Sequence, residues 1–268
     1  MFDDAQLKLY AQLIPGGFLH YGYFENPTIK PEDMSLNNIY QAQENYGHEL
    51  IKLIKNDGLI LDIGCGMGGL IRLLKENNKT VIGLTPDINQ VNHIEEKYPD
   101  VQVLDCRFED MPSETYIDAF QTVITSESLQ YLKLDEALPI IEKILKKGGQ
   151  WIACDYFKIG NQGEKSGHNW DYFEKKLNDF GFTIRYQRDI TPNVLPTIAY
   201  AYMWATRIGL PLKNFGLEKL QVKAPGIHYA LSEAIPEIET KIHKNIETVN
   251  PAIFAANKKY VLMWIERV

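Results

Sequence analysis

The fold of this chain is decided by the stretch Leu61-Asp62-Ile63-Gly64-Cys65-Gly66-Met67-Gly68-Gly69. This stretch joins a short apolar run that is typical of a buried strand (59–63) to a run with helical spacing (68–76). Glycine permits the tight turn that such a junction needs, and it lets a ligand approach the backbone closely. The stretch therefore predicts a ligand-binding loop at the carboxyl end of a strand.

Expected strands and helices alternate along the chain beyond this loop. Further strands are predicted at residues 80–84, 101–104, 120–125, 150–156 and 182–187, and further helices at 88–97, 134–145 and 170–180. This alternation is typical of a parallel sheet with helices on both faces. Ligands of such sheets bind outside the carboxyl ends of the strands, so we expect the functional residues there.

By pattern the chain divides into N-terminal helices with a loop that covers the cofactor, an α/β core, a proline-rich helical cap over the substrate, and a final core strand. These four parts cover residues 1–57, 58–189, 190–253 and 254–268. The first part includes an apolar segment at 3–14 and a helix that Ser35 caps, which runs to about residue 55. The last part contains the strand KYVLMWI at 259–265.

The composition fits a single globular α/β unit with an embellishment. The 268 residues are 45% hydrophobic and 24% charged, with a net charge of −7 that disfavours nucleic acid as a partner. The three cysteines and six histidines have no metal-ligand spacing, so no metal is expected. We find no signal peptide and no apolar run of ~20 residues, and we expect a cytoplasmic protein without a membrane span.

The glycine loop resembles the first motif, D-x-G-x-G-x-G, of class I S-adenosylmethionine-dependent methyltransferases. The resemblance is clearest over residues 59–157 and implies a Rossmann-like, doubly wound, seven-stranded and mostly parallel sheet that binds S-adenosyl-L-methionine. An NAD-dependent oxidoreductase is the alternative for such a loop. It is disfavoured because the glycines have GxGxG rather than GxGxxG spacing and because Thr85 replaces the acid at the end of the second strand.

The resemblance implies a set of cofactor contacts. Thr85 and Gln90 lie in a segment similar to one of cyclopropane fatty acid and mycolic acid synthases, where Thr and Gln contact the ribose; Asp87 is the alternative ribose ligand. Phe108 offers a flat face to the adenine, or else belongs to the core. The full set is Tyr21, Asp62, Gly64, Cys65, Gly66, Gly68, Thr85, Gln90, Arg107, Phe108, Glu109 and Ser126.

Methyl transfer requires the protein to position the acceptor and, for oxygen or carbon acceptors, to remove a proton. Candidate catalytic residues stand at strand ends and in the N-terminal loop: His20, Glu127, Asp155 and His168. A histidine with a free pKa of ~6.5 suits proton abstraction. The alternative for each histidine is a structural role as a hydrogen-bonded or capping residue.

Residues expected to contact the acceptor are Tyr23, Gln130, Tyr131, Tyr156, Tyr200 and Trp204. The segment 189–196 resembles a D-I-T-x-N-V-L-P stretch of sterol, tocopherol and other small-molecule methyltransferases, which implies a small, partly apolar acceptor. Gln130 stands where cyclopropane synthases carry Glu, which weakens that alternative function. The other alternative function is a catalytically idle cofactor-binding protein. The aromatic residues near 200 could instead belong to the core. A homodimer is left open.

Overall fold

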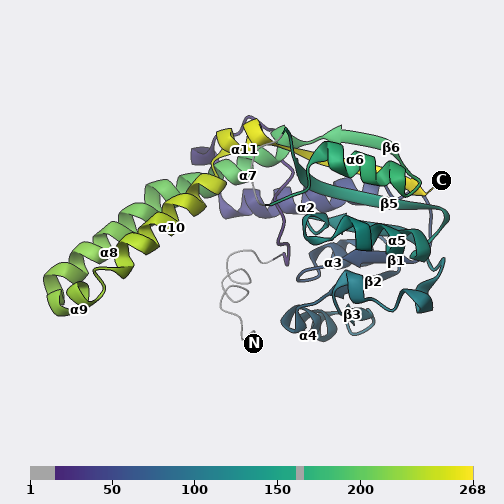
Figure 1. Cartoon of the computed structure of the whole chain (residues 1–268), viewed down its shortest axis with the longest axis horizontal. Coiled ribbons are helices and arrows are strands. Elements are labelled where there is room, and N and C mark those ends of the chain that lie inside the picture. Colours follow the sequence, from purple (N-terminus) through teal and green to yellow (C-terminus); the bar gives the residue numbers. More distant parts are fainter. Residues whose placement is uncertain (1–15, 161–165, 268) are drawn as a thin grey trace.

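The computed structural model describes residues 16–160 and 166–267, which form a seven-stranded sheet with flanking helices and a projecting helical arm (Figure 1). The order of the strands is β3-β2-β1-β4-β5-β7-β6. Their bounds are β1 Ile60–Ile63, β2 Val81–Thr85, β3 Val103–Asp105, β4 Phe120–Ser126, β5 Leu145–Lys158, β6 Phe182–Asp189 and β7 Lys258–Arg267.

Strands β1 to β5 pair in parallel, and β7 is inserted antiparallel between β5 and β6. In this register Asp62 of β1 lies beside Gly83 of β2 and Ile124 of β4, so the carboxyl ends of these strands meet at one edge. The predicted doubly wound, mostly parallel, seven-stranded sheet is therefore confirmed.

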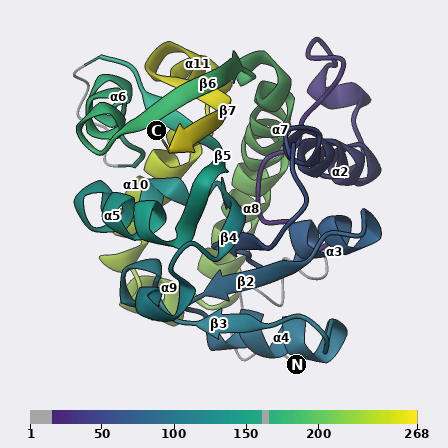
Figure 2. The ribbon, with the colours of Figure 1, turned by 90° about the vertical axis from the view of Figure 1, so that its right-hand side faces the viewer.

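Helices cover both faces of the sheet (Figure 2). One buried cluster joins the sheet to α5 and α6, and the other joins it to α2, α3, α4, α7 and α11. The bounds are α2 Leu36–Lys52, α3 Gly69–Glu76, α4 Ile88–Lys97, α5 Leu134–Ile144, α6 Trp170–Asp179, α7 Thr191–Trp204 and α11 Pro251–Asn257. Short 3-10 turns lie at Pro31–Asp33, Phe108–Asp110, Ser113–Tyr116 and Leu129–Tyr131.

Several predicted boundaries shift by a few residues. Ser35 caps α2 as expected, through a capping box with Asn38, but the helix ends at Lys52. Strand β5 begins at Leu145 rather than at residue 150, because Leu145 already pairs with Phe120 and the register shifts before Gln150. The apolar segment 3–14 lies outside the described residues.

The segment 190–253 differs most from its expected role. After α7 it forms a π-helical segment (Ala205–Gly209), α8 (Leu210–Lys223), α9 (Pro225–Ala230) and α10 (Ala234–Thr248). We call residues 205–248 the arm. The arm extends away from the sheet, with α9 at its tip (Figure 1), and α8, α9 and α10 contain no buried residue. The structure therefore corrects the expected position of a cap over the substrate.

The last strand includes the predicted residues 259–265, since β7 runs from Lys258 to Arg267. Asn250 caps α11 and Pro251 occupies its first turn, so residues 254–257 at the start of the expected last part are helical. None of the helices in the described ranges is long and apolar enough to cross a membrane.

Candidate functional site

A cavity of about 300 Å³ lies at the carboxyl ends of β1 and β4. Its walls come from the N-terminal aromatic loop (17–20), the glycine loop (64–66) and the residues after β4 (126–128). A second, mainly apolar cavity of about 190 Å³ adjoins it, since Gly64, Ser128 and Tyr131 line both. The two cavities form one elongated site at the edge of the sheet where a ligand is expected.

The glycine loop adopts the left-handed backbone that its sequence predicts. Gly64, Gly66 and Gly68 have φ angles of 74°, 55° and 79°. A Cβ at Gly64 would lie 2.5 Å from the Cβ of Ser128, so a side chain at this position would collide with the residue that separates the two cavities. The loop therefore needs glycine both for its turn and for the close approach of the β4 end.

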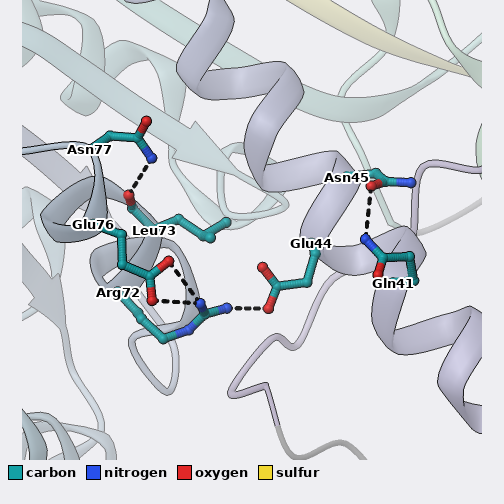
Figure 3. A network of polar contacts seen from close by, with 7 residues as sticks. All are labelled: Gln41, Glu44, Asn45, Arg72, Leu73, Glu76 and Asn77. Carbon is teal, nitrogen blue, oxygen red and sulfur yellow. Dashed lines mark hydrogen bonds and ion pairs between the residues drawn. The ribbon is translucent and has the colours of Figure 1, made fainter.

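An ion-pair network fixes the helix that follows the loop (Figure 3). Arg72 of α3 bonds to Glu44 of α2 and, at 2.9 Å, to Glu76 one turn further along α3. Its guanidinium also lies over the ring of Phe18, which lines the cavity. This network joins α2, α3 and the N-terminal loop, and the last two of these contribute residues to the wall of the larger cavity.

Asp62 supplies a polar group that the protein itself leaves unpaired. The residue is 1% exposed and lines the larger cavity, and its Oδ2 has no hydrogen-bond partner. Burial raises the pKa of Asp62 to about 7. Because a buried oxygen without a partner is costly, this carboxyl is suited to a cationic or donor group of a bound ligand.

His20 supplies a second unpaired atom in the same cavity. Its Nδ1 lies 2.7 Å from the carbonyl oxygen of Tyr21, which can only accept, so Nδ1 carries the proton and Nε2 is an acceptor. Nε2 is buried without a partner. The ring stacks on Tyr46 with a 4.1 Å centroid separation, and burial lowers the pKa of His20 to about 4. His20 is therefore neutral near pH 7.

The second cavity suits an adenine ring. Leu84, Pro86, Phe108 and Leu132 provide apolar walls. Phe108 is 2% exposed and packs in the core cluster while it also lines the cavity, so both interpretations of this residue hold. Arg107 and Glu109 add polar groups at the rim.

Gln90 is the residue of the predicted ribose pair that lines the larger cavity. Thr85 is buried and donates to Gln90 Oε1 at 2.6 Å, so it orients the amide from behind. Asp87 instead caps α4 through the Asn89 amide. Together with the unpaired Asp62 and His20, this arrangement fits S-adenosyl-L-methionine, whose methionine end would lie in the larger cavity and whose adenine would lie in the smaller one.

Glu127 is the carboxylate that faces the larger cavity directly after β4. Its backbone has a φ of 50°, which is uncommon for a residue with a side chain. Oε1 accepts the Tyr21 amide at 2.7 Å and the Tyr260 hydroxyl at 2.6 Å. Burial raises the pKa of Glu127 to about 7 in spite of these two donors. With Oε1 occupied, Oε2 is the oxygen that can receive a proton.

Two tyrosines behind Glu127 were not found by sequence reasoning. The hydroxyl oxygens of Tyr46 and Tyr260 are 3.0 Å apart, both residues are buried, and Tyr46 donates to the carbonyl of Cys154 at 3.1 Å. A tyrosine within an apolar strand or helix face could have pointed to them, because a buried hydroxyl needs a hydrogen-bond partner.

Asp155 holds the backbone of residues next to this wall of the cavity. It is 1% exposed and accepts the amides of Gln130 at 3.1 Å and Tyr156 at 2.8 Å. Burial, followed by the charge of Glu127, raises the pKa of Asp155 to about 8. Gln130 in turn donates to the Glu127 carbonyl at 3.3 Å and accepts the Tyr156 hydroxyl. Asp155 thus orders the residues around the cavity and does not line it.

The structure brings thirteen of the predicted site residues to the walls of the two cavities. These are His20, Asp62, Gly64, Cys65, Gly66, Gln90, Arg107, Phe108, Glu109, Ser126, Glu127, Gln130 and Tyr131. Sequence reasoning missed Ser128, whose hydroxyl donates to the Ile63 carbonyl at 2.5 Å and so fixes the loop between the cavities.

The other predicted residues lie behind the walls or elsewhere. They are Tyr21, Tyr23, Gly68, Thr85, Asp155, Tyr156, His168, Tyr200 and Trp204. The His168 ring is held by the Leu129 carbonyl at 3.0 Å, which matches the structural alternative for this histidine. Tyr200 packs in a separate core cluster, and Trp204 is exposed at the base of the arm, so neither contacts a molecule in the cavities.

Within the described ranges, no group of three His, Cys, Asp or Glu residues is arranged to hold a metal ion. This finding concerns residues 16–160 and 166–267 only.

Comparison with known proteins agrees with this geometry. The methyltransferase domain family matches residues 60–149. An uncharacterized methyltransferase of Alkaliphilus oremlandii is 26% identical over 133 residues, which cover 48% of this chain and 60% of that relative. The chain thus aligns with less than two thirds of that relative's length. A ubiquinone/menaquinone biosynthesis C-methyltransferase of Campylobacter jejuni is 24% identical over 64% of this chain and 75% of its own.

Among solved structures, the geranyl diphosphate C-methyltransferase of Streptomyces coelicolor, in complex with Mg²⁺, geranyl diphosphate and S-adenosyl-L-homocysteine, has the same fold. The TM-score is 0.68 at 17% identity, and the match covers 99% of this chain and 94% of that one. The matched domain, the fold and a site that fits the cofactor support a class I S-adenosylmethionine-dependent methyltransferase.

Proposed function

We propose that the chain transfers the methyl group of S-adenosyl-L-methionine to a carbon or nitrogen atom of a small, partly apolar molecule. The observation that carries this proposal is the Glu127 carboxylate on the cavity wall, whose Oε1 is held by two donors, so that Oε2 would be the oxygen that accepts a proton. The bound cofactor would supply an electrophilic methyl group on a positively charged sulfur.

The charges around the acceptor side favour an acceptor on which positive charge develops. Glu127 and Asp62 line the larger cavity, and none of the described residues that line it is a lysine or an arginine. An oxygen acceptor must approach an oxyanion before transfer, and nearby carboxylates disfavour that anion. A carbon acceptor gains positive charge on methylation, and an amine becomes an ammonium, so both are stabilised by the same carboxylates.

Glu127 has the position and the basicity for proton removal. With its pKa raised to about 7, it is a stronger base than an ordinary glutamate and is still ionised in part at neutral pH. Tyr260 and the Tyr21 amide hold Oε1 in place, so the proton would be taken by Oε2. His20, with its pKa lowered to about 4, is a weaker base and is better suited to accepting a hydrogen bond.

The names of similar proteins support an apolar carbon acceptor. Two of the proteins compared above are C-methyltransferases, one in quinone biosynthesis and one acting on geranyl diphosphate. The cyclopropane-type alternative has less support because Gln130 replaces the expected Glu and its amide is already bonded to Glu127 and Tyr156. The cytoplasmic location remains a prediction from composition.

The test is a transfer assay with cofactor labelled in the methyl group and three matched acceptors. We would use a prenylated hydroquinone, a cyclic tertiary amine and a simple phenol, and locate the new methyl by NMR. We expect a C–CH₃ or N–CH₃ product that is lost in Glu127→Gln and kept in Glu114→Gln, an exposed carboxylate paired with Lys143. A product methylated only on oxygen would refute the acceptor class, and cofactor binding without any transfer would favour the idle alternative.

A further inference from the structure

The arm exposes an unusual share of the apolar surface of the molecule. Eighteen large apolar side chains are exposed in the described residues, and nine of these lie between Trp204 and Ile238. Five of the nine form what we call the apolar stripe: Trp204, Ile208, Leu212, Phe215 and Val222, with exposed fractions of 45%, 43%, 65%, 55% and 75%.

The members of the stripe share one side of the arm. Their spacings of four, four, three and seven residues are those of a helical seam that packs against another helix. The first spacing falls in the π-helical segment Ala205–Gly209, whose wider turn keeps Trp204 and Ile208 in line. The stripe therefore has the pattern of an interface rather than of scattered surface residues.

The stripe is not needed to hold the arm together. The half-buried positions of α8 are Leu210, Lys213, Leu217 and Leu220, which lie on the opposite side of the helix from the stripe. Lys213 bonds to Glu239 of α10 at 2.5 Å, which shows that this opposite side is the one that faces α10. The second face of α8 is thus mainly apolar and exposed, and Lys219, whose ammonium lies 5.3 Å from the centre of the Phe215 ring, is the charged side chain beside it.

The stripe offers enough apolar surface for a small interface. Its five side chains, each exposing about half of the ~150–250 Å² that a large aromatic residue can bury, offer on the order of 500 Å². Two such surfaces bury about 1,000 Å² in total, which is the lower end of the range for a specific interface.

We propose that the stripe pairs with the stripe of a second copy of this chain, with the two arms antiparallel about a twofold axis. Four of the five stripe residues are arranged nearly symmetrically about residue 213, since Trp204 and Val222 each lie nine residues from it and Leu212 and Phe215 flank it. The fifth, Ile208, has Glu218 at the corresponding position. In an antiparallel pair, Trp204 of one copy lies opposite Val222 of the other. Leu212 and Phe215 of one copy then lie near the same two residues of the other copy. Such self-complementarity is what a twofold interface requires.

The charges of the arm favour a protein partner over a lipid surface. The arm carries six basic and five acidic residues, and the whole chain has a net charge of −7, so an anionic membrane offers no electrostatic attraction. Arg207, Lys213 and Lys241 are paired with Glu32, Glu239 and Glu237. The stripe can therefore be buried without stranding these charges.

The experiment is sedimentation velocity of the full chain with and without charges in the stripe. We expect a species of twice the 30.8 kDa chain mass, which becomes a monomer in Leu212→Glu/Phe215→Glu with unchanged circular dichroism. The matched control is Asn214→Glu/Gln221→Glu, which adds the same charge to exposed positions of α8 away from the stripe and should stay dimeric.

A cross-link tests the antiparallel arrangement. Cysteines in Trp204→Cys/Val222→Cys are separated by ~27 Å along one helix, too far for a bond within one chain, so a disulfide must join two copies. We expect a cross-linked dimer with this pair and none with Asn214→Cys/Gln221→Cys. A wild-type monomer at 100 µM, or a dimer that survives the stripe charges, would overturn the proposal. So would stripe-dependent flotation of a monomer with phosphatidylcholine/phosphatidylglycerol vesicles.

Discussion

The carboxyl edge of the sheet and the arm depart from ordinary burial in opposite directions. At the sheet edge, Asp62 Oδ2 and His20 Nε2 are buried without hydrogen-bond partners. On the arm, Leu212 and Phe215 are 65% and 55% exposed. Both arrangements are unfavourable for an isolated chain, because buried polar groups are normally paired and large apolar patches are normally covered. The difference teaches that the first region is completed by a small polar ligand and the second by a macromolecular surface.

The largest expected effect is on catalysis at the sheet edge. Glu127→Gln keeps the shape of the side chain but removes the base, so we expect turnover to fall by about 10²–10⁴-fold. Cofactor affinity, measured by calorimetry, should change by less than about threefold. A comparable loss of affinity would instead show that Glu127 holds the cofactor.

Asp62→Asn tests whether the unpaired oxygen is a ligand for the cofactor. We expect S-adenosylhomocysteine to bind about 10–100-fold more weakly, the effect of losing one buried, charge-assisted hydrogen bond. Unchanged affinity would remove Asp62 from the site.

The same variant should change how the stability of the ligand-free protein depends on pH. The folded-state pKa of Asp62, about 7, lies above its unfolded value, so the stability this group contributes is present below pH ~4 and is lost as the pH rises through 7. Asn does not titrate, and the variant should therefore gain stability relative to the wild type between pH 5 and pH 8. A gain of about 2–4 °C per kcal/mol in the melting temperature is expected. If the melting temperatures of the variant and the wild type differed by the same amount at pH 5 and at pH 8, titration of Asp62 would not be the cause.

A smaller effect is expected from the phenol behind Glu127. Tyr260→Phe removes a donor that stabilises the carboxylate, so the pKa of Glu127 should rise above its value of about 7. The rate of methyl transfer increases with pH as Glu127 ionises, and its midpoint should move toward higher pH by about one unit or less. A profile that is scaled down without moving would indicate a structural role for Tyr260.

The smallest effect separates the two regions. Leu212→Glu/Phe215→Glu should leave the affinity for S-adenosylhomocysteine within about twofold of the wild type, because none of the residues that line the two cavities lies on the arm. A larger change would break the comparison, since it would show that pairing of the arms is coupled to the site.

Sequence reasoning reached the sheet edge because its signals are local. The glycines at 64, 66 and 68 must be adjacent to form their turn, and strand–helix alternation is visible in short windows. The position of the arm was not visible in this way. The apolar residues of this segment are compatible with a buried cap and with an exposed helical hairpin. Which of the two forms depends on where α7 and α11 leave the sheet.

The doubly wound sheet, the cofactor loop and the place of Glu127 on the cavity wall could be predicted from local sequence patterns. The surroundings of Glu127 depend on the tertiary structure, because Tyr21 of a loop and Tyr260 of the last strand both bond to its carboxylate and Tyr46 of a helix bonds to Tyr260. The antiparallel insertion of β7 between β5 and β6 brings Tyr260 there. Such contacts depend on pairing between residues more than a hundred positions apart, which no local pattern records.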